Sequence, residues 1–181
     1  MIVKSLYDVV QFRTDWKLQF PCNLEFYSNN TDDVFKSPGI FYLFFRGELI
    51  YIGYSNNHQN IITDRVVRQL ATITFRDFRL NFTQAALDSL ISQNEMITYF
   101  RNPIPRVENS DFVTSVNRVL FASNHWDEFK NLNNQTLKLF ELHWYPNPTV
   151  GVNSSISALC DSLKKKYKPR CNKEYVKPYL G

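Results

Sequence analysis

The chain has 181 residues, of which 44% are hydrophobic and 21% are charged, and its formal net charge at pH 7 is +4. This length and composition predict one soluble globular domain over residues 1–181, and the lack of any run of eighteen apolar residues argues against a membrane span. Early charge in the N-terminal segment argues against a secretory signal, and three cysteines without a CxxC pair argue against a disulfide framework or a zinc site, so we expect a cytoplasmic protein with reduced thiols.

The first strong structural pattern is a β-hairpin over residues 39–55, GIFYLFFRGELIYIGYS. Two runs rich in aromatic, isoleucine and leucine residues flank Arg46-Gly47, and glycine at the second position supplies the positive φ angle of a tight turn. Residues 1–37 precede the hairpin, and we expect them to form an N-terminal extension.

A helix is predicted to follow the hairpin over residues 62–73, with Asn60 or Thr63 as its N-cap. Its apolar residues fall on one face at helical spacing, and Arg65 and Gln69 lie on the flank. This helix therefore presents polar side chains close to the end of the hairpin.

The second half of the chain has a less regular pattern. A helix is predicted from Thr83 over QAALDSLISQ, followed by a short strand, MITYF, whereas residues 111–130 suit either helix or strand. A further helix is predicted from near Gln135 through TLKLFELHWY, ended by Pro146 and Pro148. In this order the elements predict an α+β fold with a small, mainly antiparallel three-stranded sheet flanked by helices.

Positive charge is concentrated in a C-terminal tail, residues 156–181. From Ser162 onward seven Lys and Arg residues face Glu174 alone, a balance of +6, so the rest of the chain carries −2. Lysines interleaved with tyrosines are typical of a segment that binds a polyanion, because ammonium groups displace counterions from phosphates and the rings can stack. A solvated, frayed terminus has the same composition, and both interpretations stay open.

The hairpin also carries a more specific pattern. Gly-Ile-aromatic at residues 39–41, an apolar strand, a tight turn and then Tyr-Ile-Gly at residues 51–53 resemble the signature of the GIY-YIG nuclease superfamily. The resemblance covers residues 38–153, within an expected core of residues 38–155, and continues in the order that this family requires: an arginine on the next helix, a later helical glutamate and an asparagine after it. The matched residues are Arg65, Glu141 and Asn153.

The match departs from the family at one position, since the first triplet normally ends in tyrosine and here Phe41 precedes Tyr42. Successive strand residues point to opposite faces, so only one of the two can face the site. Pairing across the tight turn sets Phe45 opposite Glu48 and therefore Tyr42 opposite Tyr51, with both hydroxyls on one face. We favour Tyr42 for this reason; if Phe41 holds the position, catalysis is impaired or runs without that base.

The resemblance implies metal-dependent hydrolysis of a phosphodiester bond. By this resemblance Glu141 binds one divalent ion, Mg²⁺ or alternatively Mn²⁺, which stabilises the developing negative charge. Arg65 would hold the phosphate with its planar guanidinium group, and Asn153 would brace the phosphate or its loop. Tyr42 would take the proton from the attacking water, and Tyr51 would orient that water or the phosphate.

Structural interpretations of the same residues stand beside these roles. Tyr42 and Tyr51 could be core residues whose hydroxyl groups reach backbone carbonyls, and Arg65 could be a surface charge on a helix flank. Glu141 lies in an apolar run, where an unpaired carboxylate would be costly, and this favours a metal or arginine partner for it.

The implied substrate is double-stranded DNA, and the compact chain is similar to type II restriction enzymes and phage endonucleases, which act in a bacterial or phage-infected cell. Cutting both strands needs two active sites, so we expect a homodimer or a higher homo-oligomer. The alternatives are a GIY-YIG-like module that has lost catalysis and serves in DNA binding or protein interaction, a weakly specific phage endonuclease that degrades DNA, and a nuclease that acts on RNA. The expected nucleic-acid contacts, mainly to phosphates, are Arg68, Arg76, Arg79, Lys164, Lys165, Lys166, Lys168 and Arg170.

Overall fold

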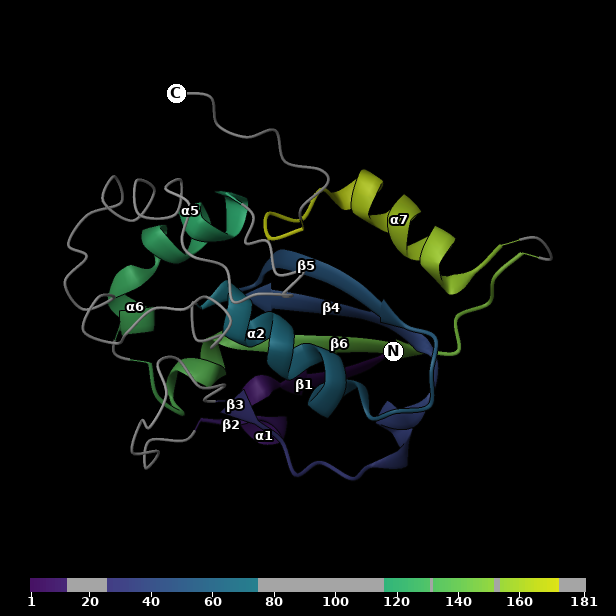
Figure 1. Ribbon diagram of the computed structural model, residues 1–181, viewed down its shortest axis with the longest axis horizontal. Coiled ribbons are helices and arrows are strands. Elements are labelled where there is room, and N and C mark those ends of the chain that lie inside the picture. Colours follow the sequence, from purple (N-terminus) through teal and green to yellow (C-terminus); the bar gives the residue numbers. More distant parts are fainter. Residues whose placement is uncertain (13–25, 75–115, 131, 152–153, 173–181) are drawn as a thin grey trace, which may run out of the picture.

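The structure is an α+β fold built around one four-stranded antiparallel sheet with the strand order β1-β6-β4-β5 (Figure 1). It is a computed structural model that describes residues 1–12, 26–74, 116–130, 132–151 and 154–172. The strands of the main sheet are β1 (Ile2–Ser5), β4 (Gly39–Phe45), β5 (Glu48–Ser55) and β6 (Phe140–Pro146). The predicted α+β class is therefore confirmed.

The main sheet has four described strands, and two of them, β1 and β6, were not predicted as strands; β1 comes from the segment expected to be an extension. Ile2 pairs with Trp144 and Ser5 with Glu141, so β1 forms one edge of the sheet. Only four residues form this strand, too few for an alternating pattern to stand out. The other elements of this segment are α1 (Leu6–Val9), the 3₁₀ helix η1 (Asp33–Lys36), and a two-stranded sheet of β2 (Gln11–Phe12) and β3 (Phe26–Tyr27).

The hairpin of β4 and β5 forms as predicted, but its register differs. Arg46 and Gly47 both have positive φ angles, 50° and 78°, which make the two-residue turn, and Phe45 pairs with Glu48. The register then shifts between Leu43 and Phe44, because Ile50 is an extra residue in β5: Phe44 pairs with Leu49, whereas Leu43 pairs with Tyr51. This β-bulge places Tyr42 opposite Ile52, and the predicted pairing of Tyr42 with Tyr51 is wrong.

The helix predicted after the hairpin is present, with an irregular first turn. A π-helical turn, η2 (Ile62–Val66), leads into α2 (Val67–Ile73). Asn60 Oδ1 accepts a hydrogen bond from the Ile62 N–H at 3.0 Å, as expected for a residue that begins a helix. The ambiguous segment that follows is helical where it is described, as α5 (Val116–Asn124) and α6 (Trp126–Lys130).

The predicted helix near residue 135 is wrong beyond its first turn. The 3₁₀ helix η4 (Thr136–Leu139) passes directly into β6, the strand between β1 and β4. Along β6, the buried side chains of Phe140, Leu142 and Trp144 alternate with more exposed ones. This period of two indicates a half-buried strand, and the high apolar content of the run obscured it.

Two layers of side chains cover the sheet. The main hydrophobic core lies on the face packed against α1, α2, α5 and α6, and it includes Phe41, Leu43 and Trp144. On the other face, α7 (Ile156–Tyr167) runs beside β5, where its Cys160 packs on Ile40 and Ile52 (Figure 1). Lys164 and its neighbours in the basic tail are thus part of an ordered helix, capped by Ser155.

Some predicted elements lie outside the described residues, namely the helix from Thr83 and the strand MITYF. Within the described parts of the chain, no helix is both long and apolar enough to cross a membrane.

We expect Gly53→Ala to lower the free energy of unfolding by about 1–3 kcal/mol, because the new methyl group would overlap the Phe41 ring and lie 2.8 Å from Tyr51 Cε1. Urea unfolding followed by tryptophan fluorescence measures this change. Gly151→Ala is the matched control, since its nearest neighbour would be Ser154 Oγ at 3.6 Å, and its effect should stay within about 0.5 kcal/mol. Equal effects of the two substitutions would contradict the close packing of Phe41 on Gly53.

Candidate functional site

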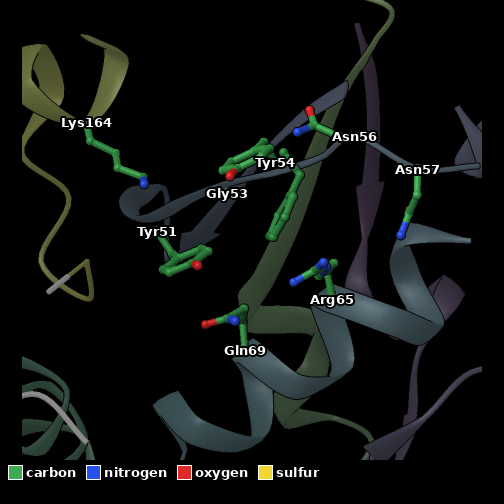
Figure 2. Close-up of a pocket in the computed structure, with 9 residues that line it drawn as sticks. Tyr51, Gly53, Tyr54, Asn56, Asn57, Arg65, Gln69 and Lys164 are labelled. Carbon is green, nitrogen blue, oxygen red and sulfur yellow. The ribbon is translucent and has the colours of Figure 1, made fainter. Parts of the chain in front are cut away.

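A cavity of about 340 Å³ lies beside β5, with residues of the η2–α2 helix on one side and of α7 on the other (Figure 2). None of the described residues that line it is acidic, and two of them are cationic. The lining therefore favours an anion over a cation. The described lining residues are Phe41, Tyr51, Gly53, Tyr54, Asn56, Asn57, Arg65, Gln69 and Lys164.

Tyr51 is the aromatic residue most firmly held in this lining. Its ring lies 5.7 Å from the Phe41 ring, between centroids, and 5.3 Å from the guanidinium carbon of Arg118. Burial raises the pKa of Tyr51, and nearby positive charges, Arg118 foremost, offset this only in part. The hydroxyl group therefore keeps its proton at neutral pH and can donate a hydrogen bond, which suits binding of an anion better than action as a phenolate base.

Arg65 reaches the cavity from η2, and Gln69 lines it one turn later, so the predicted flank of the helix faces this space (Figure 2). Arg65 Nε lies 2.9 Å from Asp64 Oδ2, and the two terminal nitrogens carry the remaining donors of this half-exposed side chain. Gln69 Oε1 accepts a hydrogen bond from Arg118 Nη2 at 2.7 Å. Since the amide oxygen is engaged, Gln69 has its NH₂ group left as a donor.

Lys164 extends from α7 toward Tyr51 from the opposite side of the cavity (Figure 2). Its Nζ atom lies 3.0 Å from Asp161 Oδ1. Burial alone would lower the pKa of Lys164, but the hydrogen bond to Asp161 and weaker interactions with Cys160 and Tyr51 outweigh it, so the pKa is raised. The ammonium group is therefore charged at neutral pH.

Arg118, which no motif in the sequence marks as functional, contacts two residues of this lining, Gln69 and Tyr51. Its guanidinium group is buried and donates to the Cys171 carbonyl at 2.9 Å, to Thr72 Oγ1 and to Gln69 Oε1. It thus joins α5, α2 and the turn after α7, next to the Tyr51 ring. The only sequence signal was an arginine within an ambiguous helical segment, which by itself predicts a surface charge.

Tyr42 does not line this cavity, because the β-bulge places it opposite Ile52 and not opposite Tyr51. Phe41 lines the cavity with Tyr51, whereas Tyr42 lies on the opposite face of the sheet and packs against the cluster under α7. Of the two alternatives for the family's tyrosine position, the structure places Phe41 beside Tyr51. The described lining thus holds no second tyrosine from β4.

The predicted metal ligand, Glu141, also lies outside this cavity. It is on β6 rather than on a helix, its side chain is half exposed, and its Oε2 atom is 3.2 Å from His143 Nε2. The strand directs it away from the core, so the desolvation cost that favoured a metal partner does not arise. Among the described residues no group of three His, Cys, Asp or Glu could hold a metal ion. The described residues that line the cavity include no carboxylate, so they do not fit Mg²⁺ or Mn²⁺.

The other residues predicted to contact nucleic acid do not line the cavity where they are described. Arg68 does not line the cavity and lies 3.7 Å from Asp64, while Arg170 forms an ion pair with Glu48 at 2.9 Å. Exposed lysines at the C-terminal end of α7 account for the rest of the described set: Lys165, Lys166 and Lys168. Three predicted residues lie outside the described residues: Arg76, Arg79 and Asn153.

Comparison of the chain with protein-family models, with curated proteins and with solved structures found no match.

We expect Arg118→Met to lower the free energy of unfolding by about 2–4 kcal/mol, because it leaves two buried acceptors and the partly buried Gln69 Oε1 without their charged donor. Arg118→Lys should recover only part of this loss, since an ammonium group lacks the planar fork that reaches all three. Urea unfolding of both variants measures the effect. A loss below about 1 kcal/mol in Arg118→Met would contradict this account.

Proposed function

We propose that the protein is a GIY-YIG-like module that binds the phosphate backbone of double-stranded DNA through the cavity beside β5. One observation carries the proposal: Arg65, Lys164 and the Tyr51 hydroxyl converge on this cavity, whose described lining has no acidic residue. Arg65 and Lys164 come from helices on opposite sides of β5, so only the folded chain brings their charges together.

The chemistry of these groups suits a phosphate. Arg65 offers paired donors in a plane, Lys164 offers a compact charge, and Tyr51 and Gln69 offer neutral donors. Each cation already lies within 3.0 Å of a carboxylate, Asp64 or Asp161. These carboxylates orient the cations, and their charge makes binding of a single small anion weak. A polyanion, which contacts many cations at once and releases counterions, is the better ligand.

DNA is favoured over other polyanions by the row of cations that continues from Lys164 along the end of α7. Lys165, Lys166 and Lys168 are exposed, and among the described residues no ion pair includes them. Backbone contacts of this kind position a protein on nucleic acid without reading its sequence. The departures at Phe41 and Glu141 support binding rather than hydrolysis by the predicted machinery.

We expect Arg65→Met and Lys164→Met each to weaken binding of a short DNA duplex by about 5- to 10-fold and to lower the slope of log K against log salt by about one. Methionine keeps the apolar stem and removes the charge. The matched control for Arg65→Met is Arg46→Met: Arg46 is about as exposed as Arg65 and also paired with a carboxylate, at 2.5 Å from Glu128, but it sits at the turn end of the hairpin. Fluorescence anisotropy measures the affinities.

Equal losses in all three variants would indicate a general charge effect and contradict a specific role of the cavity. No binding of duplex DNA by the wild-type chain at low salt would reject the proposal itself.

A second candidate function is a DNA endonuclease that works as a homodimer, and it is favoured by the shared position of Tyr51 and Arg65 in one cavity. It would require a carboxylate other than Glu141 for Mg²⁺ or Mn²⁺. Incubation of plasmid DNA with and without either ion tests this function, and we expect no cleavage. Fragments formed by the wild-type chain but not by Tyr51→Phe or Arg65→Met would contradict that expectation and make the protein a nuclease.

A further inference from the structure

The sheet face opposite the main core is covered by α7 over only part of its area. Ile40 and Ile52 are fully buried beneath this helix. Farther from α7 on the same face, side chains of β4 and β6 are partly or largely exposed. With the last residue of α7 they form what we call the aromatic face, which consists of Tyr42, Phe44, His143, Tyr145 and Tyr167.

The members of the aromatic face lie next to one another. Tyr42 pairs with His143 across β4 and β6, and the Phe44 and His143 rings are 4.3 Å apart between centroids. Tyr145 lies two residues after His143 on β6 and therefore on the same face, and α7, which ends at Tyr167, contacts β4. Burial raises the pKa of Tyr42, and the neighbouring Tyr167, Cys160 and Tyr145 raise it further. Tyr145 is 42% exposed and Tyr167 is 50% exposed, which leaves both rings accessible.

Positive charge borders the aromatic face on the side of α7. Lys166 Nζ lies 5.0 Å from the centre of the Tyr167 ring, and Lys165 and Lys168, its neighbours in the sequence, are exposed. One negative group, Glu141, is on the same sheet face, where it is hydrogen-bonded to His143 at 3.2 Å. The surface therefore combines accessible rings with a cationic margin.

This combination fits a single strand better than a duplex or an apolar protein partner. Unpaired bases expose flat π faces that stack on aromatic side chains, at about 1–3 kcal/mol per base, while lysines contact the phosphates between them. The bases of a duplex are already stacked on one another, and a purely apolar partner would leave the lysines without a role.

We propose that the aromatic face, together with Lys166, binds unpaired bases of single-stranded DNA. The inference rests on the proposed function for the class of ligand and deepens it: the cavity takes the backbone of the duplex on one side of α7, and the aromatic face takes a single strand on the other. The substrate class that uses both is DNA with a duplex part and a single-stranded part.

The test uses the full-length chain and a fluorescent oligothymidylate of about twelve nucleotides, measured by anisotropy. Tyr145→Ala with Tyr167→Ala should weaken its binding by about 10- to 100-fold, because two stacking rings are lost. Tyr145→Phe with Tyr167→Phe keeps both rings and should retain binding within about 2-fold. Glu141→Gln removes a repulsive charge and should tighten binding slightly, by about 2-fold at low salt.

A ligand of equal charge but without bases distinguishes the contribution of base stacking to affinity from that of charge. An abasic oligodeoxyribose phosphate of the same length has the same charge and no bases, so the wild-type chain should bind it about as weakly as the double alanine variant binds oligothymidylate. Equal losses of the variant for both ligands would overturn the inference.

Two further results would also overturn it while leaving the proposed function intact. One is binding of duplex but not of oligothymidylate by the wild-type chain. The other is a wild-type dimer, seen by sedimentation, that the double alanine variant converts to a monomer without a change in single-strand affinity; the aromatic face would then be a contact between two copies of the chain. If neither duplex nor single strand binds, both proposals fail together.

Discussion

One extra residue in β5 determines what each face of the sheet presents. Because Ile50 has no partner in β4, Leu43 pairs with Tyr51 while Phe44 pairs with Leu49. The bulge thereby sends Tyr51 to the face of the main core, beside Phe41, and leaves Tyr42 on the face that carries α7. The cavity and the aromatic face both depend on this offset, since a regular register would have placed the two tyrosines opposite each other.

The buried guanidinium of Arg118 is the second constraint on the site. A buried charge is costly unless its hydrogen bonds are satisfied, and here its donors reach Gln69, Thr72 and the carbonyl of Cys171. The next residue, Asn172, donates to and accepts from the backbone of Ile52 at 2.9 and 2.8 Å and so covers part of the β5 edge. The cavity wall is therefore assembled by hydrogen bonds between segments far apart in sequence.

The helix α7 relates the two proposed binding surfaces. Consecutive residues of a helix point about 100° apart, so a run of lysines cannot serve one surface alone. Lys164 is directed to the cavity, Lys166 lies at the Tyr167 ring, and Cys160 packs on the sheet. A ligand that engages both surfaces would wrap around this helix, and the apolar contact of α7 with β4 and β5 fixes the distance between them.

Local patterns in the sequence were enough to predict the α+β class, the hairpin with its Arg46-Gly47 turn, and the helix that carries Arg65, because each depends on periodicity or turn chemistry within a few residues. Only the tertiary structure decided the register at Ile50, the strand character of β6 and the role of Arg118. Register depends on packing across strands, and a strand between two others is stabilised by partners that its own sequence does not contain. Because Glu141 lies on β6 and on the sheet face opposite the cavity, it does not meet Tyr51 and Arg65, although their order along the chain predicted that it would.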